Sequence, residues 1–245
     1  MASEGRAGKT PRAGGSSRTP GQRAGLTRGD VLACALGLAE REGLEQVTMR
    51  RLAAELGVSP NALYTYFADK TAILDALFDA VLGELEPPDP EAGPWQDALA
   101  ELMRASRRLL LAHPRLAALF LSRPGGANAM RLGEATFRIL ARGGIQGKRA
   151  VDATRALLTY TLGFAAMEVP RAPEPESAER LERAAALIGA LDPEEFAATR
   201  SLARELAAHP GDAEFDTGLR WLIGGIAAEG EVCGERFAGE CLTKS

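Results

Sequence analysis

A short segment near the N-terminus combines amide and phenol side chains with small residues and has no acidic residue. Residues 59–67, SPNALYTYF, include Asn61, Tyr64 and Tyr66. An asparagine amide can bond the edge of adenine, and tyrosine hydroxyls can donate to phosphate oxygens. A small residue such as Ala62 allows a helix to approach closely in the major groove. The segment therefore has the chemistry of a DNA-reading helix.

The residues before this segment predict two helices joined by a tight turn. Thr48 can cap a helix over 48–56, and Gly57 can supply a left-handed turn. Ser59 is predicted to cap the second helix, with Pro60 at its first position. A connection of about three residues is typical of a helix-turn-helix. The alternative is an ordinary pair of surface helices, but turn, caps, apolar core and uncharged outer face all coincide here.

The next helix is predicted to connect this head to the rest of the chain. Asp69 can cap it, and Lys70 in its first turn is positioned to contact a phosphate. Apolar residues recur along it at helical spacing up to Leu82. Proline, glycine and acidic residues at 86–94 then end the helical pattern. We expect residues 26–86 to form the head with its linking helix, and residues 87–230 to form a second domain.

Composition favours an all-α protein without a membrane-spanning segment. The 245 residues are 46% hydrophobic but only 5% aromatic, and alanine and leucine dominate. No apolar run approaches the roughly 18 residues of a membrane span, and no signal-peptide pattern opens the chain. The three cysteines are an odd number without metal-ligand spacing. We therefore expect a cytoplasmic protein with no metal and no cofactor.

The charge is distributed unevenly along the chain. The net charge of −4 argues against a non-specific coat on nucleic acid, although a local DNA-contacting surface remains compatible with it. Residues 1–25 are basic and rich in Gly, Ser, Pro and Arg. We expect them to be a disordered arm. The same arm could also follow phosphates or enter the minor groove, as homeodomain arms do.

The remainder is predicted to be helical, with Pro and Gly between the helices and no strand. A proline-acid loop is expected at 170–176, and residues 231–245 are expected to be a tail. The expected helices span 95–112, 115–121, 127–142, 146–167, 177–189, 193–208 and 213–228.

The segment from Leu26 to Leu74 resembles the DNA-binding domain of TetR-family transcriptional regulators. The resemblance is carried by Leu-Ala at 52–53, LGVS at 56–59, ALYTYF at 62–67 and Lys70. It implies a recognition helix at 59–67 that binds double-stranded operator DNA, mostly to repress transcription. The DNA-contacting residues implied are Thr48, Arg50, Ser59, Pro60, Asn61, Ala62, Tyr64, Tyr66 and Lys70.

The second half resembles the C-terminal domain of tetracycline repressors more loosely. The matching signposts are PWQDAL at 94–99, LSRP at 121–124, YTLG at 160–163 and FDTGL at 215–219. This resemblance implies a ligand cavity in each subunit and a homodimer joined by a four-helix bundle. The bundle would use helices 146–167 and 213–228, whose small or apolar contact residues would be Ala153, Ala156, Gly163, Gly218, Leu222 and Gly225.

The resemblance fails where a tetracycline would bind. Glu86, Leu102 and Ser106 stand where the drug-contacting His, Asn and Phe are found, and Leu119 replaces a metal-binding His. Glu168 alone could match an acidic residue of the metal shell, and one carboxylate is weak evidence for magnesium. We therefore expect a small, largely apolar effector. Its pocket is predicted to involve Leu102, Met103, Ser106, Phe120, Met130, Phe137, Tyr160, Phe164 and Met167.

A ligand-responsive regulator has two alternatives from other classes of function. An enzyme or carrier in a helical shell would need a nucleophile with a base, a metal-ligand cluster or a phosphate loop, and the sequence has none of these patterns. A DNA-binding regulator without an effector remains the nearer alternative. A fully packed second domain would favour it.

Overall fold

The computed structural model describes residues 25–123, 125–168 and 178–242, omitting the side chains of residue 121 and of residues from 230 onward. The described residues form helices and no strand, which confirms the expected all-α class. The predicted basic arm lies outside them except for Gly25, and so does the loop expected at 170–176.

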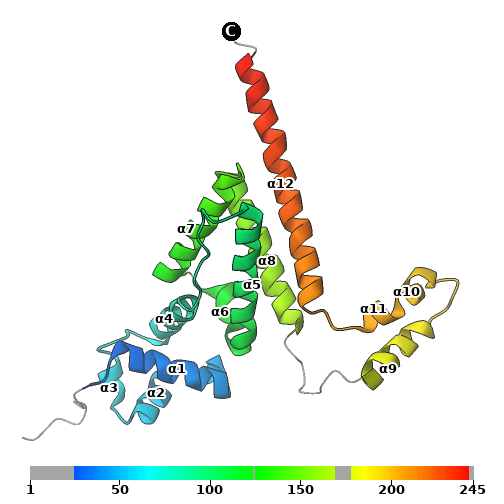
Figure 1. Cartoon of the computed structure of the whole chain (residues 1–245). Helices are drawn as coiled ribbons and strands as arrows, with labels where there is room; N and C mark the ends of the chain where they lie inside the picture. Colours follow the sequence, from blue (N-terminus) through cyan, green and yellow to red (C-terminus); the bar gives the residue numbers. More distant parts are fainter. Residues whose placement is uncertain (1–24, 124, 169–177, 243–245) are drawn as a thin grey trace, which may run out of the picture.

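The N-terminal head consists of four α-helices (Figure 1). They are α1 (Arg28–Glu42), α2 (Met49–Leu56), α3 (Pro60–Leu63) and α4 (Lys70–Leu82), with a 3₁₀ turn η1 (Leu44–Gln46) between the first two. Three expected local signals are confirmed. The Thr48 hydroxyl accepts the Arg51 N–H at 3.2 Å, and the Asp69 carboxylate accepts the Ala72 N–H at 2.8 Å. Gly57 ends α2 in the left-handed region, at φ 66°.

The second helix of the motif differs from its prediction. Ser59 makes no side-chain capping bond, and α3 is a single turn that ends at Leu63. The Tyr66 and Phe67 N–H groups both bond the Leu63 carbonyl, so the chain turns instead of continuing as a helix. Aromatic and β-branched residues are poor helix formers, and this stretch contains both kinds.

A second group of helices forms the body of the molecule (Figure 1). Two of these helices lie alongside the N-terminal half of the last helix in the chain. The C-terminal half of that last helix extends beyond them (Figure 1). The elements are α5 (Trp95–Ala112), η2 (Pro114–Leu116), α6 (Ala117–Ser122), α7 (Ala127–Arg142), α8 (Lys148–Glu168) and α12 (Asp212–Leu242). Residues 231–242, predicted to be a tail, are therefore helical. They contain no proline, and single glycines lower helix stability without ending a helix.

A separate helical arm extends away from the body in Figure 1. It consists of α9 (Ala178–Gly189), α10 (Ala197–Ser201) and α11 (Ala203–Ala207), with α11 packed on α9. The single helix expected at 193–208 is thus divided at Leu202. Leu187, Leu202 and Leu206 are more than half exposed on this arm.

Helix α4 shares one apolar core with both the head and the body. Its buried face includes Leu77, Phe78 and Val81, and the same core contains the buried residues of α1 and α2. Leu109 of α5 and Leu119 of α6 belong to that core as well. The head is therefore packed onto the body through α4.

Polar contacts also fix α4 to the beginning of α7. The Asp79 carboxylate accepts the Asn128 N–H at 2.9 Å, so a residue of one helix caps another. The Asn128 side-chain amide donates to the Asp79 carbonyl at 2.8 Å. A Cβ at Gly126 would lie 2.6 Å from the Asp79 carboxyl carbon, and one at Gly83 would lie 2.8 Å from the Asn128 amide nitrogen. Both glycines are required for this close approach.

A buried arginine ties three helices of the body together. Arg107 of α5 is 6% exposed and forms a bidentate pair with Glu168 of α8. Its Nη1 also donates to Asp212 of α12 at 2.7 Å, and the guanidinium lies 4.9 Å from the ring centre of Phe215. These carboxylates raise the pKa of Arg107, the hydrogen bond to Glu168 contributing most. Arg107 therefore keeps its positive charge, and this charge compensates the negative charge of the Glu168 carboxylate.

Replacing Arg107 by Met should therefore destabilise the protein strongly. It leaves the nearly buried Glu168 carboxylate without a partner, which typically costs about 3–5 kcal/mol. The double variant Arg107→Met/Glu168→Met should recover most of that loss. Urea unfolding measures both, and Arg108→Met, whose side chain is 61% exposed, is the matched control with less than about 1 kcal/mol expected. Equal effects at positions 107 and 108 would contradict this assignment.

Candidate nucleic-acid interface and effector cavity

The tip of the head presents polar side chains without a carboxylate. Ser59, Pro60 and Asn61 are exposed on α3, and Tyr64 is 53% exposed directly after it. Ala62 is half-buried, while Leu63 is fully buried and anchors the turn. The tip can therefore approach a groove closely, with an amide and a phenol available for hydrogen bonds.

The other residues expected to contact DNA divide into free and engaged groups. Arg50 and Thr48 are exposed, and the Thr48 hydroxyl still has its hydrogen to donate. Lys70 donates to the carbonyls of Leu44 at 3.1 Å and Glu45 at 3.3 Å, which leaves one of its three hydrogens free.

Tyr66 has a different position from the one expected. It is half-buried, and its hydroxyl donates to the Leu26 carbonyl at 2.6 Å. A phenol has one hydrogen, so this group cannot also donate to a phosphate while the bond persists. Arg28, which sequence reasoning missed, supports the same turn: it donates to the Tyr66 carbonyl at 2.8 Å and stacks 4.0 Å from the Phe67 ring centre. Tyr66 therefore connects the turn after α3 to the segment that begins α1.

The acidic side chain of α2, that of Glu55, is paired with arginines. Glu55 pairs with Arg41 at 3.0 Å and Arg51 at 3.4 Å. The hydrogen bond from Arg41 is the main cause that lowers the pKa of Glu55. Arg51 also pairs with Glu42 at 2.8 Å, which orients this network toward α1. Arg50 is left outside it, with its charge available to a partner.

A partly open cavity of about 240 Å³ lies between helix α4 and the body. This volume is slightly below the range of about 300–1,000 Å³ common for small-molecule sites. Phe78 and Leu82 of α4 form one wall, so the helix that carries the head is also part of the cavity. The other walls come from α5, α6, α7 and α8, with lining residues that include Leu102, Met103, Ser106, Leu110, Phe120, Arg123, Ala129, Leu132, Gly133, Thr136, Thr154, Leu158, Thr161 and Leu162.

Gly133 keeps part of this cavity open. It lies in the interior of α7, where glycine is less favourable than alanine by about 1 kcal/mol. A Cβ added to it would meet no atom within 4 Å. Close packing therefore does not require this glycine. Gly133 is one of the residues that line the cavity, and the open space beside its Cα is part of that cavity.

Four of the nine residues expected in the pocket line this cavity, and five do not. Leu102, Met103, Ser106 and Phe120 are among its lining residues. Met130 and Met167 are 67% and 62% exposed, and Phe137 is 39% exposed. Tyr160 and Phe164 instead pack with Phe215 of α12, with ring centres 5.3 and 5.2 Å from it. Helical periodicity identified the apolar residues but not which face of each helix turns toward the cavity.

Tyr160 also helps to position α12 on α8. Its hydroxyl donates to the Phe215 carbonyl at 2.9 Å, and burial is the main cause that raises its pKa. A Cβ at Gly218 would lie 2.3 Å from that hydroxyl oxygen. Gly218 therefore permits close packing within one subunit, and its expected role between subunits stays a prediction.

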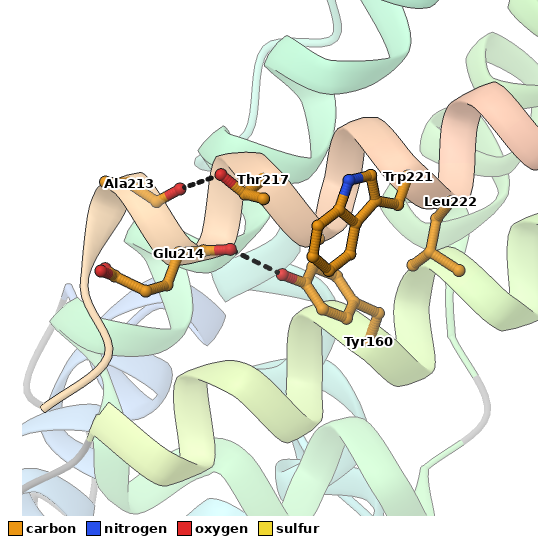
Figure 2. Close-up of a pocket in the computed structure, with 7 residues that line it drawn as sticks. Tyr160, Ala213, Glu214, Thr217, Trp221 and Leu222 are labelled. Carbon is orange, nitrogen blue, oxygen red and sulfur yellow. Dashed lines mark hydrogen bonds between the residues drawn. The ribbon is translucent and has the colours of Figure 1, made fainter. Parts of the chain in front are cut away.

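Two open grooves follow the outer face of α8 and α12. Figure 2 shows the larger, of about 730 Å³, where Trp221 lies over Tyr160 beside Leu222. The second, of about 390 Å³, adjoins it. Trp221 is 73% exposed, which is unusual for so large an apolar side chain. Of the expected dimer residues, Gly218 and Leu222 line the first groove, and Ala153, Ala156, Leu222 and Gly225 line the second; Gly163 is exposed on α8.

Two residues aligned with a tetracycline–magnesium site have other roles in this structure. Leu119 is buried in the core shared by head and body, and Glu168 is engaged by Arg107. Across the described ranges, no group of three or more His, Cys, Asp or Glu residues is placed to hold a metal ion. In the same part of the chain, no helix combines the length and apolar character of a membrane span.

Two family models match this chain. Residues 31–77 match the model for bacterial regulatory proteins of the tetR family, and residues 87–229 match the tetracyclin repressor-like C-terminal domain. Among curated proteins, an HTH-type transcriptional regulator of Saccharopolyspora erythraea is 35% identical over 207 residues, covering 83% of this chain and 85% of that protein. The class C tetracycline repressor protein of Escherichia coli is 32% identical over 203 residues, covering 82% and 90%.

Solved structures agree with these matches. Apo ActR from Streptomyces coelicolor superposes with a TM-score of 0.76 at 31% identity, covering 89% of this chain and all of that one. ActR in complex with actinorhodin gives a TM-score of 0.77 at 31% identity, covering 84% and 97%. These relatives are transcriptional regulators and not enzymes. The chain belongs to the TetR family of DNA-binding transcriptional regulators.

Proposed function

We propose that this protein is a ligand-responsive repressor that binds a near-palindromic operator as a homodimer and is released by a small, largely apolar effector. The observation that carries the proposal is the double role of α4. Its Phe78 belongs to the core of the DNA-binding head and lines the cavity. An occupant of the cavity would therefore act directly on the helix that carries the head.

In this proposal, residues 26–86 contact DNA and residues 87–230 bind effector and partner subunit. Asn61 and Arg50 would read base edges, while Thr48, Tyr64 and Lys70 would contact phosphates. Ser59, Pro60 and Ala62 would allow the close approach. Two heads would occupy major grooves about 34–36 Å apart or a multiple of that distance. The basic residues 1–25 could add phosphate contacts, and the cytoplasm is the compartment that suits such a regulator.

Replacing Asn61 and Tyr64 by Ala should abolish specific binding with little effect on stability. Both side chains are exposed, and a good base contact contributes about 1–3 kcal/mol of discrimination. The measurement is a mobility shift with DNA from upstream of its own gene or a neighbouring gene. Arg138→Ala, at an exposed position of α7 in the body, is the control. Unchanged specific binding by the double variant would refute the assigned reading tip.

The proposed dimer uses the outer face of α8 and α12. That face carries the two grooves and the exposed Trp221, and an exposed aromatic beside small residues suits a helix–helix contact. A four-helix bundle there would place the two heads on one side of a twofold axis, as a palindromic operator requires.

Effector release follows if the occupied cavity favours another position of α4. A ligand shifts such an equilibrium only by its difference in affinity for the two states. The ActR complexes with actinorhodin and with (S)-DNPA show that a relative with this fold binds small molecules. A regulator without an effector is the alternative, and the open cavity beside Gly133 argues against it.

Filling the cavity from Gly133 tests this part of the proposal. Gly133→Leu should preserve operator binding, because the new side chain enters open space and leucine favours helix. The same variant should lose the response to any small molecule that releases the parent protein from its promoter. Gly133→Ala, which adds one methyl group, is the graded control. A Gly133→Leu variant that responds like the parent would place the effector elsewhere.

A further inference from the structure

The polar groups of the cavity specify what kind of molecule fits it. Four hydroxyl residues line it, one on α5, one on α7 and two on α8. Each hydroxyl donates its hydrogen to the carbonyl four residues earlier, at 2.7–2.8 Å. A hydroxyl has one hydrogen and two lone pairs, so these groups are left as acceptors. They are Ser106, Thr136, Thr154 and Thr161.

The charged groups at the cavity favour an uncharged ligand. Arg123 is the charged residue among the lining residues, and it is already paired with Asp75 at 3.0 Å. A ligand cation would find no carboxylate in the lining. A ligand anion would add a negative charge without a counter-charge, because Asp75 already balances the charge of Arg123. Burying an unpaired charge is costly, so a neutral molecule is favoured.

Arg123 also presents an unused donor. The Nε of Arg123 is buried and has no hydrogen-bond partner. Among the described residues, it is the only buried side-chain nitrogen or oxygen without one. Leaving such a donor unsatisfied costs about 1–3 kcal/mol. A hydroxyl group on a ligand can donate to the threonine oxygens, and its own oxygen can accept from a guanidinium that turns toward the cavity.

The rest of the wall suits a ring system. Phe78 and Phe120 meet edge to face with ring centres 5.0 Å apart, and aliphatic side chains complete the surface. Gly133 adds open space on the α7 side. Aromatic walls favour flat, polarisable ligands through stacked and edge contacts.

We infer that the effector is a neutral aromatic ring compound that carries hydroxyl groups, and that threonine oxygens of α7 and α8 accept hydrogen bonds from it. The inference rests on the proposed role of this cavity as the effector site. Carboxylates and amines of the same size should bind this cavity more weakly.

Matched probes on one ring system test the inference. The purified full-length protein is titrated with naphthalene, a naphthalenediol, naphthoate and naphthylmethylamine, using calorimetry. The diol should bind about tenfold or more tightly than each of the others, since one net hydrogen bond of about 1.4 kcal/mol corresponds to tenfold. Equal or tighter binding of naphthoate or the amine would overturn the inference, and so would the absence of binding by all four.

Variants identify the groups responsible. Thr136→Val/Thr154→Val preserves side-chain volume and should weaken diol binding about tenfold while leaving naphthalene binding unchanged. Thr136→Ser/Thr154→Ser, which restores the hydroxyls, should recover diol affinity, and Thr159→Val at an exposed α8 position should have no effect. Equal loss for diol and naphthalene, or no rescue by serine, would contradict the assigned hydrogen bonds.

The operator assay separates this inference from the proposed function. If the diol binds through the threonines but leaves the protein–DNA complex intact, the ligand class stands and the release mechanism fails. If another molecule releases DNA and the Gly133→Leu variant still responds to it, the effector site lies elsewhere and the inference falls with it.

Discussion

The structure depends on one packing interaction: the apolar face of α4 is buried on two sides at once. Leu77, Phe78 and Val81 close the core of the head, while Leu109 and Leu119 of the body pack against the same cluster. Phe78 in addition lines the cavity and meets Phe120 edge to face. Packed interiors are dense and resist gradual deformation. A ligand that needs a different cavity wall can therefore bind only if α4 moves as a unit.

Polar contacts decide which parts can move together. Asp79 caps α7 from within α4 and so joins the head-bearing helix to a second wall of the cavity. The buried Arg107 joins α5, α8 and α12 through its ion pairs with Glu168 and Asp212. The proposed subunit contact on α8 and α12 is thereby connected through α5 to the cavity. A ligand-dependent shift of α4 would occur against this fixed frame.

Local signals in the sequence predicted the fold well, and the cavity poorly, for identifiable reasons. Thr48, Gly57 and Asp69 act through neighbouring backbone groups, so their roles are visible in the sequence itself. The exposed positions of Trp221 and Met167, and the internal bond of Tyr66, depend on which face of a helix meets a distant element. Periodicity alone does not contain that information. Gly133 and the α4 wall could have been suspected only from a glycine inside an otherwise regular helix and from the apolar breadth of residues 73–82.

The shared core can be tested without any ligand, because both tryptophans, Trp95 and Trp221, lie in the body. Leu52 is fully buried in the head, and Leu52→Ala should cost about 2–5 kcal/mol. In urea unfolding followed by tryptophan fluorescence and by circular dichroism, the account predicts that this substitution in the head lowers both midpoints together. An unchanged fluorescence transition, preceded by a separate loss of helical signal, would show that head and body fold independently and would contradict the central role assigned to α4.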